Sequence, residues 1–256
     1  MQNAALVALS RQMVLQHEME VVANNIANID TNGFKADISL FEEYLMSGAR
    51  DGHFRVADSP VSFVHERGTL IDLNQGALQR TGSPLDVAIN GDGFLVIQTP
   101  QGERYTRNGA LQINAQGELV TSQGYQVLGD GGPIAFQTQD TGITINPEGT
   151  VSVKDAANAT IEIIRGRMRI VNFTQPQRLQ KEGHSTFSTP AGMVANPSTT
   201  ARVVQGALEK SNVLPIVEMS HMIEVSRAYT MTANLVQAEG DLRKTAIQQL
   251  SDVPTS

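Results

Sequence analysis

Five histidines and 26 acidic residues are the side chains in this sequence most suited to metal chemistry. His17-Glu18 and His65-Glu66 each begin the zinc-protease pattern, but Val21 and Thr69 stand where a second histidine is required. The stretch His221–Glu224 places a histidine and a carboxylate on one helix face, and two ligands alone do not hold a metal ion. There is no cysteine, so disulfides and thiolate ligands are excluded. We therefore predict no metal site.

Gly91-Asp92-Gly93 follows a predicted strand, as a phosphate-binding loop would. No Lys-Ser/Thr pair follows it, no third glycine stands at the dinucleotide spacing, and another strand comes next, so a hairpin turn explains it better. Asp86 and Asp92 are placed to approach each other across that hairpin like a glycosidase pair, but the chain has no tryptophan to form a sugar platform. No Gly-x-Ser-x-Gly nucleophile elbow occurs. The sequence predicts no catalytic or cofactor-binding residue, no cofactor and no small-molecule substrate, and we do not expect an enzyme.

The charge pattern excludes a nucleic-acid partner. The formal net charge is −7, and no run of Lys and Arg exceeds two residues, whereas a phosphate-binding surface needs a basic stripe. Residues 1–6 carry no positive charge, and polar side chains interrupt the apolar pattern that follows, unlike a secretory signal peptide. We expect any export of this chain to use a route without a cleaved signal peptide.

The elements at the two ends of the chain are predicted to be helices with narrow apolar seams. The first seam keeps the a/d spacing of a heptad repeat and stops at Asp30–Gly33, where Asn and Gly tolerate the left-handed conformation of a helix end. It consists of Ala5, Ala8, Gln12, Leu15, Met19, Val22, Ile26 and Ile29. The second helix begins near Pro215, which suits a first helical turn. Its seam consists of Met219, Met222, Ser226, Tyr229, Ala233, Val236, Gly240, Arg243, Ile247 and Leu250.

These helices have two interpretations. They are ordinary amphipathic helices that pack on the rest of the chain, or they pair with each other or with the helices of neighbouring subunits. The narrow seams and the terminal positions favour pairing.

Between the helices the apolar pattern alternates with period two, which indicates short strands. Gly-containing turns such as Asn90-Gly91 and Asn108-Gly109 separate these strands, and no helical pattern intervenes. The expected architecture is therefore α+β, with an antiparallel sandwich or barrel between the two helices. The predicted strands are 86–90, 94–97, 110–113, 118–120, 126–128, 143–145, 151–153, 161–164 and 168–171.

The segments that join these parts are less regular. Phe41–Met46 has the composition of a short helical turn, and 48–62 that of a polar loop. Residues 172–205 are rich in Thr, Ser and Pro and are expected to be extended chain that leads back to the C-terminal helix.

Three sequence blocks resemble those of bacterial flagellar rod and hook proteins. The first is Asn24-Asn25-Ile26-Ala27-Asn28 followed by Thr31-Asn32-Gly33-Phe34-Lys35. The second is Gly76–Phe94, continued by Tyr105–Gly109, and the third is Gln205–Val213 leading into Met222–Tyr229. The chain departs from the family where Leu214-Pro215-Ile216 replaces the usual polar run.

The resemblance implies a structural subunit of the flagellar basal-body rod, which spans the periplasm. It implies that the terminal helices pair as an antiparallel coiled coil, while the β domain faces outward. The expected domains are an N-terminal helix (1–33), a connector (34–75), a β domain (76–172), an extended return segment (173–212) and a C-terminal helix (213–252). The implied partners are other rod and hook subunits and the flagellar export apparatus.

Within that family, Ser10–Met13 and Phe41–Leu45 are most similar to a proximal-rod subunit, with a distal-rod subunit as the alternative. A secreted binding module, with its partner site on the β domain, is a third possibility. Because an isolated helix pair with narrow seams buries little apolar surface, we also expect the ends to be mobile in the monomer.

The residues expected to carry assembly lie on the two helices. They are Leu15, Met19, Val22, Asn24, Asn25, Ile26, Asn28, Met222, Val225, Tyr229, Ala233 and Val236. The amides of Asn24, Asn25 and Asn28 either cap the helix end locally or bind the backbone of a neighbouring subunit. A structural role is expected for Gly33, Phe34, Gly91 and Gly93, with Phe34 as an anchor under the connector.

Overall fold

The protein divides into two compact units in the computed structural model, which describes residues 2–46, 61–155, 162–183 and 185–251. Unit 1 takes its residues from Met1–Ala27, Asp37–Leu70 and Leu214–Ser256. Unit 2 takes its residues from Asn28–Ala36 and Ile71–Val213. The expected α+β class, with an antiparallel β region between a helix near each end, is confirmed.

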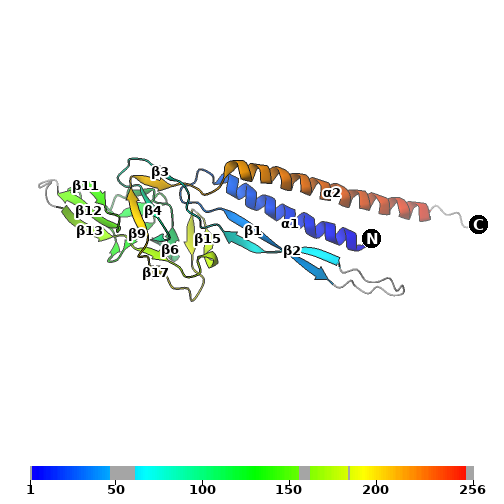
Figure 1. Ribbon diagram of the computed structural model, residues 1–256, viewed down its shortest axis with the longest axis horizontal. Coiled ribbons are helices and arrows are strands. Elements are labelled where there is room, and N and C mark those ends of the chain that lie inside the picture. The colour runs from blue at the N-terminus through cyan, green and yellow to red at the C-terminus, as the bar shows by residue number, and fades with distance from the viewer. Residues whose placement is uncertain (1, 47–60, 156–161, 184, 252–256) are drawn as a thin grey trace, which may run out of the picture. The chain divides into compact units, whose positions relative to one another are not determined.

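Unit 1 contains both long helices, α1 (Gln2–Ala27) and α2 (Pro215–Ser251), which lie side by side (Figure 1). Two side-chain contacts fix their direction. The amide of Gln12 donates to the hydroxyl of Tyr229 at 3.1 Å, and Nε2 of His221 lies 2.9 Å from Oε1 of Glu18. Residue numbers rise along one helix as they fall along the other, so the two helices are antiparallel.

The seam between the helices is narrow. Leu15 and Val22 of α1 and Val225 of α2 are buried, whereas Met19 and Met222 are half-buried. From Ala8 to Ile26 the expected α1 seam residues are buried or half-buried. In the expected α2 seam Met219 and Ser226 are exposed, and Glu218 and Val225 are the less exposed residues beside them. The other expected seam residues up to residue 240 are half-buried, namely Met222, Tyr229, Ala233, Val236 and Gly240.

The rest of unit 1 is a pair of strands, β1 (Asp37–Met46) and β2 (Val61–Ile71). The helical turn predicted for Phe41–Met46 is wrong, because this short apolar run forms part of β1 and pairs with β2. Most of the loop predicted for 48–62 lies outside the described residues, and positions 61 and 62 belong to β2.

The N-terminal helix is shorter than the predicted 1–33, because α1 ends at Ala27. Local polar bonds replace the helical ladder after it: the Thr31 hydroxyl donates to Oδ1 of Asn28 at 3.1 Å, and the Thr31 N–H donates to the Asn28 carbonyl. Gly33 then adopts the left-handed conformation, with φ of 68°.

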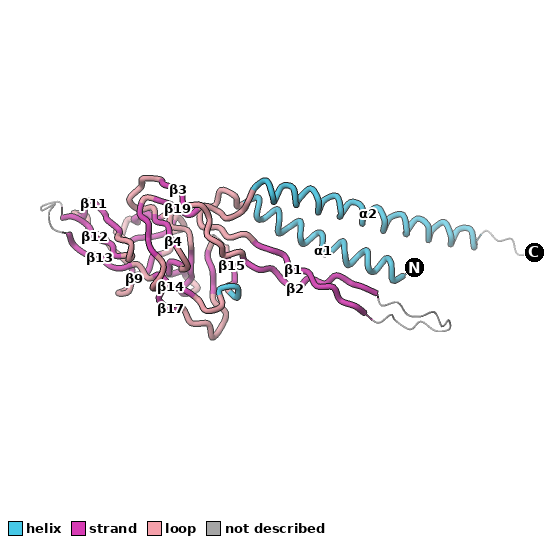
Figure 2. The backbone as a smooth tube through the Cα atoms, in the orientation of Figure 1, coloured by secondary structure: helices cyan, strands magenta, loops and turns pink. Residues whose placement is uncertain are grey.

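Unit 2 consists of short strands, loops and one 3₁₀ turn, η1 (Pro176–Arg178) (Figure 2). Its strands, in chain order, are β3 (Leu78–Arg80), β4 (Val87–Asn90), β5 (Phe94–Thr99), β6 (Gly102–Thr106), β7 (Leu111–Ile113), β8 (Leu119–Thr121), β9 (Gln126–Gly129), β10 (Gly132–Pro133), β11 (Asp140–Ile145), β12 (Thr150–Asp155), β13 (Glu162–Arg167), β14 (Ile170–Asn172), β15 (Gln180–Glu182), β16 (Thr186–Ser188), β17 (Asn196–Pro197), β18 (Arg202–Gln205) and β19 (Ala207–Glu209).

These strands pair antiparallel in one large and three small sheets. The large sheet runs β15-β16-β6-β5-β9-β8-β7, with β10 beside β9, and with β14 beside β5 and β17. The small sheets are β11-β12-β13, β18-β4 and β19-β3. The return segment 173–212, expected as extended chain, therefore also supplies β15 to β19.

Strand β5 shows how this unit forms its core. Leu95 and Ile97 pack into one apolar cluster, and Phe94 and Val96 pack into a second cluster on the other face. Successive side chains of a strand point to opposite faces, so a strand buried on both sides is a continuous apolar run. The second cluster includes edge-to-face contacts among aromatic rings, such as Phe94 with Phe187 at 5.4 Å between centroids.

Candidate functional site

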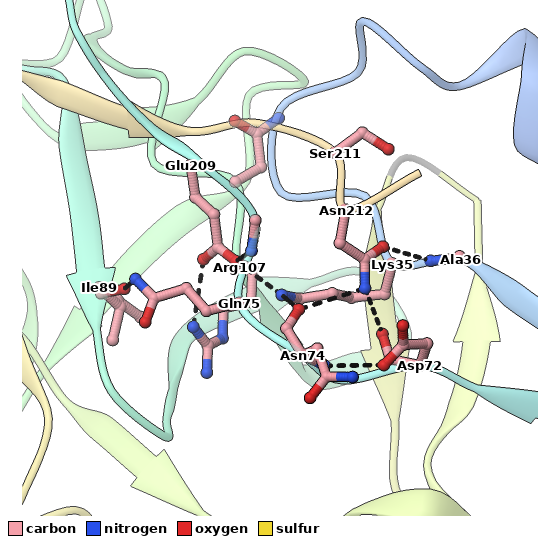
Figure 3. Close-up of polar contacts among 12 residues, drawn as sticks. Lys35, Ala36, Asp72, Asn74, Gln75, Ile89, Arg107, Glu209, Ser211 and Asn212 are labelled. Atoms are coloured by element: carbon pink, nitrogen blue, oxygen red, sulfur yellow. Dashed lines mark hydrogen bonds and ion pairs between the residues drawn. The ribbon is translucent and has the colours of Figure 1, made fainter. Parts of the chain in front are cut away.

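A cluster of three buried charged side chains lies in unit 2, where the segment that follows α1 meets the segment that precedes α2 (Figure 3). Lys35 and Glu209 are 0% exposed, and Arg107 is 4% exposed. The three residues come from three sequence blocks that are far apart in the chain, and each block belongs to one of the motifs singled out above. We call this group the charge cluster.

The carboxylate of Glu209 is the centre of the charge cluster. Its Oε1 accepts hydrogen bonds from Nζ of Lys35 at 2.6 Å and from the backbone N–H of Gly76 at 3.0 Å. Its Oε2 accepts from Nη1 of Arg107 at 3.1 Å. One buried anion therefore neutralises charge on two buried cations, and each bond is of the stronger, charge-assisted kind.

The ammonium of Lys35 is held by partners that oppose the cost of its burial. Burial lowers the pKa of Lys35, the Glu209 carboxylate offsets part of this effect, and the nearby Arg107 charge adds to the lowering. The ammonium also donates to the carbonyl of Asn74 at 2.8 Å.

Arg107 connects the cluster to the hairpin of Gly91 and Gly93. Its Nη2 donates to the carbonyl of Gly91 at 2.9 Å, and its guanidinium lies 5.3 Å from the centre of the Phe94 ring. Gly93 is buried, and a Cβ there would lie 2.8 Å from a methyl of Ile170. Gly91 thus bonds the cluster directly, and Gly93 packs closely against Ile170.

Hydrogen bonds beside the cluster join the segment that follows α1 to the segment that precedes α2. The N–H of Gly33 donates to the carbonyl of Glu209 at 2.7 Å. The side-chain oxygen of Asn212 accepts from the N–H of Ala36 at 2.7 Å, and its amide donates to the carbonyl of Asp72 at 2.9 Å. The chain leading out of α1 and the chain leading into α2 are therefore held side by side within unit 2.

Phe34 is an anchor in this junction. It is 4% exposed and packs with Ala36, Val213 and Ile29. The ammonium of Lys181 lies 3.7 Å from the centre of its ring and donates to the carbonyl of Lys35 at 2.7 Å.

The three predicted asparagines have different surroundings. Asn25 is buried, and its amide exchanges two hydrogen bonds with the backbone of Asp37, both at 2.9 Å. Asn28 accepts the local bond from Thr31, and Asn24 is exposed. Asn28 thus bonds locally beyond the helix end, Asn25 instead bonds the first residue of β1, and Asn24 is exposed on α1. A bond from any of the three to a neighbouring subunit stays a prediction.

The other predicted assembly residues lie along the helices. Ile26, Tyr229, Ala233 and Val236 are half-buried, in addition to the seam residues described above. Tyr229 accepts a hydrogen bond from Gln12 of the paired helix. A contact of these residues with other subunits stays a prediction.

Sequence reasoning missed the roles of Lys35, Arg107 and Glu209. The only signal in the sequence was a single charged residue next to apolar ones, as in Phe34-Lys35-Ala36 and Leu208-Glu209. A buried charge needs a partner, but the sequence does not show which partner lies near.

Among the described residues, no group of three or more His, Asp or Glu side chains lies close enough to hold a metal ion. Within the same part of the chain, no helix combines the length and the apolar character needed to cross a bilayer.

We predict that Gly33→Ala destabilises unit 2 more than Gly82→Ala does. Both glycines have positive φ, so alanine costs about 1–2 kcal/mol in conformational strain at each position. A Cβ at Gly33 would in addition lie 2.5 Å from backbone atoms of Arg107 and Asn108, whereas nothing lies within 4 Å at Gly82. Urea unfolding of the full chain measures the difference, and equal losses for the two variants would contradict the close packing of this turn.

We also predict that Glu209→Gln destabilises the chain by about 3–5 kcal/mol, because it leaves two buried cations without their anion. The matched control is Glu182→Gln, which removes a carboxylate from the partly exposed pair with Arg104 and should cost below about 1 kcal/mol. Thermal unfolding at neutral pH compares them, and a cost for Glu209→Gln no larger than the control's would show that the cluster is not needed for stability.

Three family models match successive parts of the chain, and all three describe flagellar rod or hook proteins. Residues 6–35 match the model of flagella basal body rod proteins. Residues 88–153 match the D1 domain of flagellar hook proteins FlgE/F/G, and residues 204–249 match the C-terminal part of flagellar basal body rod FlgEFG proteins.

Individual relatives align over nearly the whole chain. It is 38% identical to flagellar basal-body rod protein FlgF of Caulobacter vibrioides, over 99% of this chain and 100% of the relative. It is 34% identical to flagellar basal-body rod protein FlgG of Borreliella burgdorferi, over 94% of this chain and 96% of the relative. It is 32% identical to FlgF of Escherichia coli K12, over 98% and 99%. With helices near both ends, a β unit between them and relatives of this extent, the chain belongs to the family of flagellar basal-body rod proteins.

Proposed function

We propose that this chain is a structural subunit of the flagellar rod that polymerises along the rod axis through α1 and α2. The observation that carries the proposal is the distribution of exposed apolar side chains. Ten of the eighteen large hydrophobic residues that are exposed in the described part of the chain lie on these two helices, which have 26 and 37 residues in a chain of 256. They are Leu9, Met13, Ile216, Val217, Met219, Ile223, Met231, Leu235, Leu242 and Ile247.

Residues 228–242 of α2 carry the most regular of these surfaces. We call it the outer stripe, and it comprises Ala228, Met231, Leu235, Ala238 and Leu242. The spacing of 3, 4, 3 and 4 residues is that of a coiled-coil seam. Met231 and Leu235 are 70% and 58% exposed, so this seam has no partner helix within the described chain. A contiguous apolar surface of this kind is typical of an interaction site.

The pairing of α1 with α2 is proposed to be an antiparallel coiled coil that persists in the rod. Leu15 and Val225, both buried, stand at matching heights in the register set by Gln12 with Tyr229. The outer stripe then presents a second seam to a neighbouring subunit, so each α2 has one partner inside the subunit and one outside it.

The rod context also suggests the partners and the location. We propose that the partners are other rod and hook-family subunits, that the chain passes through the flagellar export apparatus without a cleaved signal peptide, and that the assembled rod spans the periplasm. This chain is 38% and 32% identical to the two FlgF relatives and 34% identical to the FlgG relative, so sequence identity does not separate FlgF from FlgG. The sequence blocks support the proximal rod, and this position is part of the proposal.

We predict that Met231→Asp/Leu235→Asp abolishes swimming and rod assembly without unfolding the monomer. Both side chains are exposed, so their replacement costs the isolated chain little, but it places charge in the proposed intersubunit seam. The control is Asn234→Asp/Gln237→Asp, which puts the same charges on exposed polar positions of the same helix. Motility in soft agar, the content of purified basal bodies and thermal unfolding provide the readouts. Normal rods in the first variant would refute the outer stripe as an assembly surface.

Deletion of 2–27, or separately of 215–251, tests the broader alternative. A secreted binding module with its site on unit 2 would keep its activity without either helix. A rod subunit would lose assembly in both deletions, provided that the β unit remains folded by circular dichroism. Complete rods and swimming after either deletion would move the functional surface to unit 2.

A further inference from the structure

Three Asn-Gly pairs occur in the chain, and all three lie in unit 2: Asn32-Gly33, Asn90-Gly91 and Asn108-Gly109. In such a pair the asparagine side chain reacts readily with the main chain, because glycine has no Cβ to hinder the approach. This reaction, deamidation, is one reason why asparagine is a thermolabile residue.

Deamidation begins when the glycine nitrogen attacks the side-chain amide. A bond forms between that nitrogen and Cγ, the bond from Cγ to Nδ2 breaks, and the amide leaves as ammonia with the proton of the glycine N–H. Water then opens the resulting succinimide ring at either of its two carbonyls and gives aspartate or isoaspartate. The reaction therefore needs a glycine N–H that is free to lose its proton, an asparagine side chain that is free to turn, and access for water.

The pair Asn32-Gly33 does not meet these needs. Gly33 is buried, and its N–H donates to the backbone carbonyl of Glu209 at 2.7 Å. Asn32 is half-buried beside it. Because both partners of this hydrogen bond belong to the buried junction, the N–H is freed only when the junction itself opens.

The pair Asn108-Gly109 is held in a different way. The side-chain oxygen of Asn108 accepts a hydrogen bond from the N–H of Ala110 at 3.1 Å. Gly109 is buried so tightly that a Cβ there would lie 1.7 Å from the carbonyl oxygen of Val87. Neither the side chain nor the glycine backbone is free to turn into a ring.

The pair Asn90-Gly91 is shielded only by one exposed side chain. Asn90 is the last residue of β4 and is exposed. The N–H of Gly91 donates to Oε1 of Gln75 at 3.2 Å, and Nε2 of Gln75 donates to the carbonyl of Ile89 at 3.1 Å (Figure 3). The amide of Gln75 thus bonds the peptide groups on both sides of Asn90. We call these two hydrogen bonds the Gln75 clamp.

We propose that Asn90 is a site of deamidation and that the Gln75 clamp sets the rate of this reaction. Gln75 is itself exposed, and a long side chain in solvent gains conformational entropy when it leaves its partners. The clamp therefore opens more often than the buried backbone bond of Gly33 does. When it opens, the N–H of Gly91 is free next to an asparagine that water already reaches, so Asn90 reacts before Asn32 and Asn108.

The reaction at Asn90 changes the surroundings of the charge cluster. The carbonyl of Gly91 accepts a hydrogen bond from Nη2 of Arg107 at 2.9 Å. Isoaspartate at position 90 adds one carbon to the main chain just before Gly91, which moves this carbonyl relative to Arg107. Aspartate at position 90 adds only a charge, and it lies opposite Arg202, the antiparallel partner of Asn90.

The first test follows deamidation of the full chain during incubation in mildly alkaline buffer, and peptide mapping by mass spectrometry separates the three sites. In the folded chain the product at Asn90 is expected to form well before those at Asn32 and Asn108. In urea, where the clamp and the backbone bonds are lost, the three sites are expected to react at similar rates. Faster reaction at Asn32 or Asn108 in the folded chain, or the same ranking in urea, would overturn the proposal.

The second test changes the clamp. Gln75→Ala removes both hydrogen bonds and is expected to speed deamidation of Asn90 by about threefold to tenfold, the factor that the net loss of one hydrogen bond allows. Gln75→Glu keeps an acceptor for the N–H of Gly91 and is expected to restore the slow rate. The matched control is Gln139→Ala, which removes an exposed glutamine whose amide donates to the side chain of Gln137.

The other two Asn-Gly pairs report on general loosening of unit 2 in these variants. A faster reaction at Asn32 and Asn108 as well as at Asn90 would show that Gln75→Ala loosens the fold, and an unchanged rate at Asn90 would show that the clamp has no effect on it. Either result would overturn the role of Gln75.

The third test concerns the product. The isoaspartate form, isolated by chromatography, is expected to unfold at a lower temperature than the untreated chain, whereas Asn90→Asp is expected to unfold close to it. An isoaspartate form as stable as the untreated chain would contradict the proposed link between Asn90 and the Arg107 contact.

Discussion

Glu209 has no contact with solvent, so its carboxylate must obtain all its compensating charge and hydrogen bonds from the chain. It obtains them from Lys35, Arg107 and the N–H of Gly76, which lie 174, 102 and 133 residues away in sequence. Each of these contacts requires the segment of Glu209 to meet another distant segment, and an incomplete cluster leaves a buried charge unpaired. The cluster therefore favours one arrangement of the segments that lead to the two helices, and alternative registers of those segments carry a large free-energy penalty.

The helices are under the opposite constraint. Their shared seam buries only a few side chains fully, among them Leu15, Val22 and Val225, while large apolar residues remain in solvent. Helix formation in water needs tertiary packing because nucleation is costly and the gain per residue is small. A helix pair with one satisfied seam and one unsatisfied seam gains most of its remaining stabilisation from a further partner. This is the physical reason why a subunit of this composition is suited to polymerisation.

The sequence predicted what depends on periodicity and on turn chemistry. The α+β class, the two helices, nine of the strands and the inward packing of Leu15, Met19 and Val22 all follow from local patterns. Phe41–Met46 was assigned to the wrong element, because a short apolar run fits a helical turn and a strand equally well until its partner strand is known. In the first turns of α2 the expected seam is wrong at Met219 and Ser226 for a related reason. The buried Val225 and the exposed Ser226 are adjacent, and the choice between them depends on how α1 approaches.

The charge cluster could not be predicted from the sequence, for a different reason. Lys35, Arg107 and Glu209 look like surface residues when each is taken alone, and only long-range pairing distinguishes a buried charge from a solvated one. The same limit applied to Asn25, whose backbone partner Asp37 is separated from it by the end of α1 and the junction.

The chain thus separates the interactions that fold it from those proposed to assemble it. The charged side chains of the junction in unit 2 are buried and bind partners from the same chain. The outer stripe is apolar, largely exposed and on α2. A net charge of −7 makes monomers repel one another at long range, which opposes premature association in solution.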